Sequence, residues 1–258
     1  MPSEHAPPER LVWTPELVAR FWDGVAHTAL DAQSFARIAG PLVILAARSH
    51  FTPGGRHLDF GAGDGTLTRL MIEAGFPTAA CEPAPERRAV LERRLAGLDG
   101  FLGAEAEAHA PYDAVLMAEV IEHVLDRDLD PVLRTVHGFL RPGGRLVITT
   151  PHAEDLDASM VYCPVSNTLF HRWQHVRSLT PESLAALLAP RGFRVIVTHL
   201  VEFSNLGFLL PPERLRLPWP VGPLWRRLRT AQLARRFASG RPVRLGNRSH
   251  MVCVAERL

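Results

Sequence analysis

The residues with the clearest capacity for chemistry lie in one glycine-rich run, Asp59-Phe60-Gly61-Ala62-Gly63-Asp64-Gly65. Glycines at alternate positions allow a tight turn, and they let the backbone approach a ligand without an intervening Cβ atom. We expect a buried strand before this loop and a helix after it, whose free N–H groups face the ligand. A dinucleotide-binding fingerprint, G-x-G-x-x-G, needs its third glycine where Thr66 stands, so the spacing disfavours that class of site.

Two carboxylates accompany the glycine loop. Glu82 ends the second expected strand, where α/β nucleotide-binding folds hold a ribose. One carboxylate can accept hydrogen bonds from two adjacent hydroxyls, so we predict that Glu82 binds a ribose diol rather than only opening the next helix. Asp59 either organises the loop through its backbone or meets the polar end of the ligand.

A second motif with chemical potential is Glu119-Val120-Ile121-Glu122-His123. The spacings i, i+3 and i+4 predict that Glu119, Glu122 and His123 share one side of a helical turn. Two carboxylates and an imidazole suit Mg²⁺ or Mn²⁺ when a further ligand approaches, and His175 is the candidate for that ligand. The alternative is a site without metal, in which His123 caps a helix or acts as a general base. His152 is a second candidate base.

A third group of ligand-type residues follows the Cys163-Pro164-Val165-Ser166 segment and includes His171 and His175. Its spacing approaches that of a small zinc site, but Ser166 stands where a second thiolate is needed. We therefore expect a loop on the substrate side of the molecule rather than a closed zinc site.

The elements that must position these residues alternate between strands and helices, which predicts an α/β fold with helices on both faces of a parallel sheet. We expect strands at 56–60, 77–82, near Phe101, and at 112–118, 145–150, 193–203 and 250–255. We expect helices at 14–30, 41–49, 65–74, 84–96 and 128–140, another opened by Thr180, and one at 223–238. Ligands of such sheets bind beyond the carboxyl ends of the strands, so the motifs should face one crevice.

Four motifs together resemble class I S-adenosylmethionine (SAM) methyltransferases of the type 11/12-like group. They are Asp59–Gly65, Glu82, Tyr112–Met117 and Leu140–Leu146, and the resemblance covers about residues 50–200. It implies a Rossmann-like, doubly wound, mostly parallel seven-stranded sheet whose last strand, supplied by 249–256, is antiparallel. It also implies that SAM lies across the cofactor-binding residues Asp59, Gly61, Gly63, Gly65, Glu82 and the backbone near Met117.

The acid–histidine motif resembles two subgroups, the ubiquinone-pathway O-methyltransferases and the small-RNA 3′-terminal 2′-O-methyltransferases. In the second subgroup, two glutamates and two histidines hold a metal, which by carry-over would be Glu119, Glu122, His123 and His175. A bound cation would lower the pKa of an acceptor hydroxyl and orient it.

The resemblance implies a SAM-dependent methyltransferase (EC 2.1.1.-) with a small-molecule acceptor, methylated at oxygen if the acid–histidine motif has this role. Two alternatives stay open: methylation of an RNA 3′-terminal 2′-hydroxyl, and a SAM-binding protein without transferase activity. A nicotinamide oxidoreductase is the weakest alternative, because of the glycine spacing.

Composition limits these hypotheses further. The 258 residues are 47% hydrophobic and 22% charged, as in ordinary globular proteins, and all basic residues are arginine or histidine. Without lysine, Schiff-base and Walker-type chemistry are excluded. Three widely spaced cysteines, no secretory leader and no long apolar run predict a cytoplasmic protein.

We predict a single domain over 1–258, with an N-terminal helical cap (1–50), a Rossmann-like core (51–203 and 247–258) and a basic helical insert (204–246). Within the insert, residues 211–244 carry many arginines interleaved with tryptophan, leucine and phenylalanine. Three roles are open for this segment: a lid over the active site, a contact with an anionic membrane surface, and a contact with RNA. The second role predicts a protein that is peripheral at the membrane.

Overall fold

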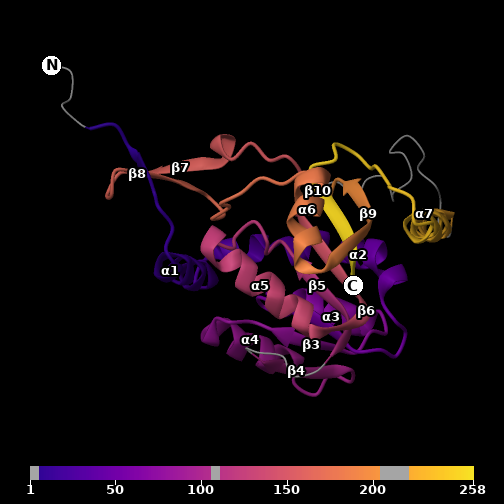
Figure 1. Ribbon diagram of the computed structural model, residues 1–258. Coiled ribbons are helices and arrows are strands. Elements are labelled where there is room, and N and C mark those ends of the chain that lie inside the picture. The colour runs from indigo at the N-terminus through magenta and orange to yellow at the C-terminus, as the bar shows by residue number, and fades with distance from the viewer. Residues whose placement is uncertain (1–5, 106–110, 204–220) are drawn as a thin grey trace.

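The computed structural model describes residues 6–105, 111–203 and 221–258 of the chain, and its main feature is a seven-stranded sheet (Figure 1). The strand order is β4-β3-β2-β5-β6-β10-β9. These strands are β2 (His57–Phe60), β3 (Thr78–Cys81), β4 (Phe101–Glu105), β5 (Tyr112–Ala118), β6 (Leu140–Pro151), β9 (Phe193–Val201) and β10 (His250–Arg257). Strands β2 to β6 pair in parallel, and β10 is antiparallel to both of its neighbours. The predicted Rossmann-like architecture is confirmed.

Both faces of the sheet are covered by helices, because successive residues of its central strands point to opposite sides. In β5, Ala114 and Leu116 face one side, where α2 (Phe35–Ala47), α3 (Thr66–Glu73) and α7 (Val221–Ala238) pack. Val115 and Met117 face the other side, under α5 (Asp126–Phe139) and α6 (Pro181–Leu188). The remaining α-helices of the described chain are α1 (Pro15–Ala26) and α4 (Pro85–Leu95). None of the described helices is long and apolar enough to cross a membrane.

Two helix starts follow local signals in the sequence, whereas the helix expected over 14–30 ends at Ala26 and the helix expected from 128 begins at Asp126. Thr14 caps α1 through its hydroxyl, and Thr180 forms a capping box with Ser183 at the start of α6. The prediction that the second helix begins near Pro41 is wrong, since α2 begins at Phe35 and contains Pro41. An internal proline costs about 3 kcal/mol of helix stability. Here the burial of the helix face on both sides of Pro41, from Ala39 onward, offsets that cost.

A second, three-stranded sheet was not predicted, and two of its strands lie in or beside the segment expected to be a loop. It joins β1 (Glu9–Arg10), β8 (Thr168–His171) and β7 (Met160–Cys163), in the order β1-β8-β7 (Figure 1). Cys163 pairs with Thr168 at one end of the β7–β8 hairpin, whereas Met160 pairs with His171 at the other. Three residues of strand separate those ends by about 10 Å, too far for Cys163 and His171 to share one ion. The hairpin therefore separates Cys163 from His171, and the absence of a closed zinc site stays a prediction.

The core beneath α7 contains a histidine whose protonation should limit stability in acid. His199 on β9 is fully buried, and burial, with the charge of His50 second, lowers its pKa to about 4. The unfolded chain takes up this proton near pH 6.5 and the folded chain only near pH 4, so acid favours unfolding between these values. We expect this site to cost up to about 3 kcal/mol of unfolding free energy by pH 4.

Chemical denaturation of the wild type and of His199→Phe at several pH values measures this contribution. The phenylalanine keeps the ring contact with Phe237 and removes the titrating group, but it leaves the Val243 N–H without its acceptor. We therefore expect a variant that is less stable at pH 7.5 but loses less stability on acidification. Equal losses in the two proteins would show that His199 is not the group responsible.

Candidate active site

The glycine loop connects β2 to α3 in the conformation that its sequence predicted. Gly61, Gly63 and Gly65 have φ values of 79°, 56° and 78°, in the left-handed region. At Gly61 a Cβ atom would lie 2.6 Å from Cγ2 of Val120, so the close approach of these two loops requires glycine. Gly65 is the N-cap of α3, and the loop therefore opens onto a helix N-terminus.

Glu82 follows β3 and lies directly against the glycine loop. Its Oε2 accepts a hydrogen bond from Gly63 N at 2.8 Å, and its Oε1 accepts one from Ala84 N at 3.0 Å. Burial raises the pKa of Glu82, against the opposing charge of Arg87. A carboxylate has about four acceptor positions, so two remain for ligand hydroxyls. Glu82 therefore keeps acceptor positions for the predicted ribose role, which stays a prediction.

Asp59 and Met117 occupy more interior positions than Glu82. Asp59 is buried and accepts a 2.7 Å hydrogen bond from Oγ1 of Thr68 on α3. Burial raises its pKa to about 7, against the hydrogen bond of Thr68. Asp59 thus ties β2 to α3 behind the loop. The Met117 side chain lies in the core, so its backbone alone is available to a ligand.

Three residues near the loop were missed by the sequence analysis. Asp64 accepts from Thr66 N at the start of α3 and forms ion pairs with Arg37 (2.6 Å) and Arg94 (2.5 Å). These arginines come from α2 and α4, so Asp64 joins both helices to the loop. The position of Asp64 inside the glycine motif could have indicated a structural role, but no sequence spacing predicts that Arg37 and Arg94 are its partners.

Arg87 on α4 lies between the glycine loop and helix α1. Its guanidinium carbon lies 5.4 Å from the centre of the Trp22 ring on α1. A terminal nitrogen of Arg87 lies 2.7 Å from the position of a Cβ atom at Gly63. Trp22 and the glycine loop therefore flank the same guanidinium group, and α1 forms a wall beside the loop.

The acid–histidine motif occupies a turn between β5 and α5, so the prediction of a helical turn over 119–123 is wrong. Glu119 has a φ of 52°, in the left-handed region, and α5 begins only at Asp126. The reversal at Glu119 breaks the helical spacing of the motif, although its carboxyl group stays beside that of Glu122. Its Oε1 accepts from Oγ1 of Thr149 at 2.9 Å, and its Oε2 lies 3.7 Å from Nε2 of His250. Burial and the charge of Glu122 raise its pKa well above the usual range.

Glu122, His123 and His175 do come together and form a Glu–His–His group. One ligand-type atom of each lies within 4.8 Å of the others. Glu122 is buried, and among the described residues neither of its oxygens has a hydrogen-bond partner, although Glu119 and Thr150 approach it. Nδ1 of His123 is likewise buried without a partner in the described part of the chain. Three of the four predicted ligands, Glu122, His123 and His175, therefore lie close enough together to contact one ligand.

The electrostatics of this group follow from burial. Burial raises the pKa of Glu122 to about 7, against the charge of His175. Burial, with the charge of His175 second, lowers the pKa of His123 to about 3. His123 is therefore neutral at pH 7 and offers a lone pair. Unpartnered buried carboxylate oxygens beside the neutral imidazole of His123 have the chemistry of a site that receives a cation or a polar hydroxyl.

Gln174 locks the N-terminal cap onto the Glu–His–His group. It is fully buried, and its φ of 62° places it in the left-handed region. Its Nε2 donates to the carbonyl of His123, and its Oε1 accepts from Nε1 of Trp22, both at 3.0 Å. The Trp22 ring also contacts His123 edge-on, with centroids 4.9 Å apart. The Trp22 and Gln174 partnership was missed, because no local spacing connects positions so distant in the chain.

Glu154, which follows β6, contacts His175 of the Glu–His–His group and the neighbouring His171. Its Oε2 lies 2.5 Å from Nδ1 of His175, and its Oε1 lies 3.3 Å from Nε2 of His171. Burial alone raises the pKa of Glu154, but the hydrogen bond and charge of His175 more than offset this, and the pKa lies below its usual range. The other predicted base, His152, points Nδ1 at the Arg248 carbonyl (3.0 Å), and its role stays a prediction.

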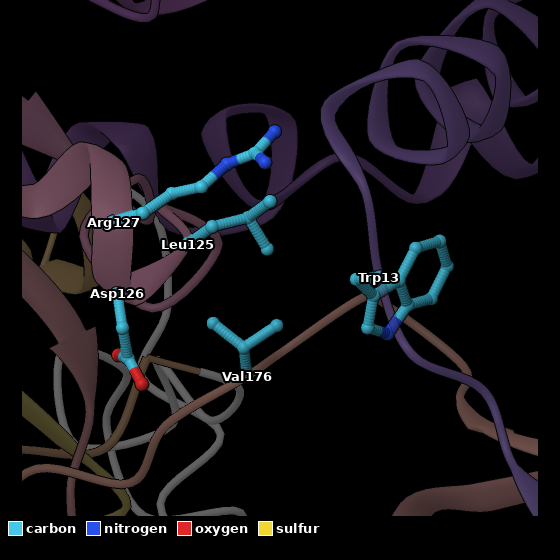
Figure 2. Close-up of a pocket in the computed structure, with 5 residues that line it drawn as sticks. All are labelled: Trp13, Leu125, Asp126, Arg127 and Val176. Atoms are coloured by element: carbon cyan, nitrogen blue, oxygen red, sulfur yellow. The ribbon is translucent and has the colours of Figure 1, made fainter.

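An open pocket of about 290 Å³ lies beside this site (Figure 2). Its lining includes Trp13, ahead of α1, and Val176, directly after His175. Leu125, Asp126 and Arg127, at the start of α5, complete the lining residues of the described chain. Figure 2 shows the Leu125 and Val176 side chains facing Trp13 across the opening. The pocket is thus an apolar approach to the loops that carry His123 and His175.

Comparison with known proteins agrees with this geometry. A family model described as a methyltransferase domain matches residues 31–198, more than half of the chain. The ubiquinone biosynthesis O-methyltransferase of Xylella fastidiosa is 34% identical over 179 residues, covering 64% of this chain and 69% of that protein. Its mitochondrial counterpart from Homo sapiens is 29% identical over 164 residues, covering 55% of this chain, which spans 42% of the human protein.

A solved structure supports the fold over nearly the whole chain. The 1,6-didemethyltoxoflavin-N1-methyltransferase of Burkholderia thailandensis has bound 1,6-didemethyltoxoflavin and S-adenosylhomocysteine. It superposes with a TM-score of 0.58 at 19% identity, covering 98% of this chain and 94% of that chain. With the glycine loop, Glu82 and the strand order, these matches show that the chain belongs to the methyltransferase domain family of class I SAM-dependent methyltransferases.

Proposed function

We propose that the protein transfers the methyl group of SAM to a hydroxyl oxygen of a small molecule. The observation that carries this proposal is the contact between the donor loop and the polar residues after β5. Val120, between the two glutamates, touches Gly61 so closely that a Cβ atom there would clash. Glu122 and His123, just after Val120 in the chain, therefore lie close to the glycine loop, which we propose binds SAM. The ubiquinone-pathway relatives named as O-methyltransferases support oxygen as the acceptor atom.

The chain's own residues would act mainly by binding and orientation, since the sulfonium of SAM already activates the methyl group. The glycine loop and Glu82 would hold the donor. Trp22 and the pocket beside Leu125 and Val176 would hold the apolar part of the acceptor. The Glu–His–His group would accept hydrogen bonds from the reacting hydroxyl, and Glu122, whose pKa burial raises to about 7, can receive a proton from that oxygen.

We further propose that a divalent cation binds at Glu122, His123 and His175. The residues fit such an ion, because a buried carboxylate without partners is costly unless a cation or donor meets it. Two imidazoles and one carboxylate suit Mn²⁺ better than Mg²⁺, which prefers oxygen ligands. The ion would supply Lewis acidity toward the acceptor hydroxyl. Glu119, the fourth predicted ligand, is engaged by Thr149 and stands apart from this set.

A methyl-acceptor screen with labelled SAM tests the proposal. The purified protein is incubated with phenols, catechols, amines and short RNAs, each with Mn²⁺ and with EDTA. Labelled product from a hydroxyl compound is expected, with a lower rate in EDTA. Product from an amine alone would reject oxygen transfer, product from RNA alone would favour the RNA alternative, and full activity in EDTA would reject the cation. Binding of SAM without any labelled product would favour the non-catalytic alternative.

We also propose that α7 contacts an anionic membrane surface. No acidic residue occurs between 221 and 255, and Arg227, Arg229, Arg235 and Arg236 on α7 are exposed. Leu224 and Leu228, on the same helix, are 57% and 61% exposed beside these arginines. Exposed leucines among arginines fit the interface of a bilayer better than a nucleic-acid backbone. Residues 211–220 of the predicted basic segment lie outside the described residues.

We expect wild-type protein to float with phosphatidylglycerol vesicles and not with phosphatidylcholine vesicles. Each arginine near an anionic surface contributes about 1 kcal/mol, so Arg227→Glu with Arg229→Glu should weaken binding at least ~10-fold. Arg20→Glu, on the exposed face of α1, is the matched control. Tighter binding to RNA than to vesicles, or equal flotation of the double variant, would contradict the proposal.

A further inference from the structure

Glu154, His171 and His175 form a second group of ligand-type residues, whose atoms lie within 4.8 Å of one another. The group shares His175 with the Glu–His–His group. It contains no residue of the acid–histidine motif, and Glu154 was not singled out by the sequence. The hydrogen bonds among Glu154, His171 and His175 indicate whether these three residues bind an ion themselves or orient His175 toward the Glu–His–His group.

The tautomer of His171 is determined by the backbone around it. Its Nδ1 accepts from Trp173 N at 3.3 Å and from His175 N at 3.1 Å. A ring nitrogen that accepts hydrogen bonds carries a lone pair, so the proton of neutral His171 is on Nε2. An ion at that Nε2 would have to displace the proton and leave an imidazolate. The proton on Nε2 of His171 therefore faces Oε1 of Glu154 at 3.3 Å without forming a regular hydrogen bond, and His171 is not suited to bind a metal.

The ring of His175 is fixed from the opposite side. Its Nδ1 lies 2.5 Å from Oε2 of Glu154, and an ionised carboxylate only accepts hydrogen bonds. The His171 and His175 rings are stacked, with centroids 4.4 Å apart and planes 20° from parallel. Carboxylate, stacked ring and backbone together restrict rotation of His175. The remaining ring nitrogen, Nε2, is the one available to Glu122 and His123.

We propose that Glu154 is a positioning residue that, in the neutral form of His175, holds the ring proton on Nδ1 and the lone pair on Nε2, for use by the Glu–His–His group. This proposal rests on the proposed function for the use of that lone pair, but not for the tautomer itself. A carboxylate behind a ligating histidine typically improves metal affinity 10- to 100-fold. The same arrangement would orient His175 toward an acceptor hydroxyl if no ion is bound.

Glu154→Gln gives an asymmetric prediction, because one carboxylate oxygen becomes an NH₂ group that can only donate. His171 cannot change its tautomer, since its Nδ1 accepts two backbone hydrogen bonds. The amide oxygen of the new glutamine should therefore accept from His171, and its NH₂ group should face His175. We expect the His175 proton to move from Nδ1 to Nε2, which removes the lone pair that the Glu–His–His group requires.

Long-range ¹H–¹⁵N NMR of histidine-labelled protein at pH 8 reads these tautomers, and His175→Asn assigns the His175 ring. We expect Nδ1–H for His175 in the wild type, Nε2–H in Glu154→Gln, and Nε2–H for His171 in both. Glu182→Gln, an exposed position on α6, is the matched control and should leave every tautomer unchanged. His175 with its proton on Nε2 in the wild type, or on Nδ1 in Glu154→Gln, would overturn the proposal.

Calorimetric titration with Mn²⁺ and S-adenosylhomocysteine separates this role from the proposed function. We expect Glu154→Gln to bind Mn²⁺ at least ~10-fold more weakly while S-adenosylhomocysteine affinity stays within ~2-fold. Unchanged Mn²⁺ affinity in the variant would count against Glu154. Absence of Mn²⁺ binding in the wild type would reject the cation instead, and the NMR result would still decide the role of Glu154.

Discussion

Glu122→Gln is expected to reduce methyl transfer by about 10²- to 10⁴-fold, the usual contribution of a positioned proton acceptor or metal ligand. The substitution keeps the shape of the side chain and removes only its charge. Because Glu122 lies in the turn and not in the glycine loop, S-adenosylhomocysteine affinity should stay within ~2-fold. Initial rates at saturating SAM, beside calorimetric affinity, measure the two effects separately.

The same substitution should not destabilise the folded protein. Burial raises the pKa of Glu122 to about 7, so above that pH the wild type holds a buried charge that lacks a hydrogen-bond partner. Removing an unpaired buried charge is neutral or stabilising. We therefore expect the melting temperature of Glu122→Gln at pH 8, without metal, to equal or exceed that of the wild type. Full activity of this variant, with Glu182→Gln as the control, would reject the proposed role of Glu122.

Glu82→Ala should abolish tight binding of the methyl donor. Two hydrogen bonds to a charged acceptor contribute about 1.5–3 kcal/mol each, so their loss predicts at least a ~100-fold weaker affinity for S-adenosylhomocysteine. Isothermal titration calorimetry measures this change. Glu86→Ala, at an exposed carboxylate on α4 that pairs with His27, is the control and should bind normally.

Glu82 also holds the backbone of Gly63 and Ala84, so its loss could loosen the loop. Circular dichroism on Glu82→Ala separates unfolding from loss of binding. Glu82→Gln is a second variant, which keeps an acceptor for one backbone N–H and should bind with intermediate affinity. Unchanged affinity in Glu82→Ala would mean that the ribose is held elsewhere.

The features predicted most accurately from the sequence are those whose causes are local in the chain. The glycine loop, the strand before it and the helix after it are contiguous, so spacing alone determined their arrangement. The nearly continuous apolar, buried run of β5 and the Thr14 cap of α1 have equally local causes. Each depends on backbone geometry that a few neighbouring residues dictate.

The features that were not predicted depend on contacts between distant parts of the chain. Trp22 and Gln174 are 152 positions apart, and their hydrogen bond arises only when α1 packs beside the site. The pairing of β1 with β8 is similarly remote, and its short strands have no strong periodic pattern. Glu119 shows a different limit, because its left-handed backbone breaks the helical spacing from which its place among the ligands was predicted.

The central claim, that the glycine loop and Glu82 bind SAM, is tested most directly by calorimetric titration of the purified protein. Parallel titrations use S-adenosylhomocysteine and NAD under the same conditions. We predict saturable one-to-one binding of S-adenosylhomocysteine, lost in Glu82→Ala, and no heat from NAD. No binding of S-adenosylhomocysteine by folded wild-type protein, or binding of NAD in its place, would contradict the account.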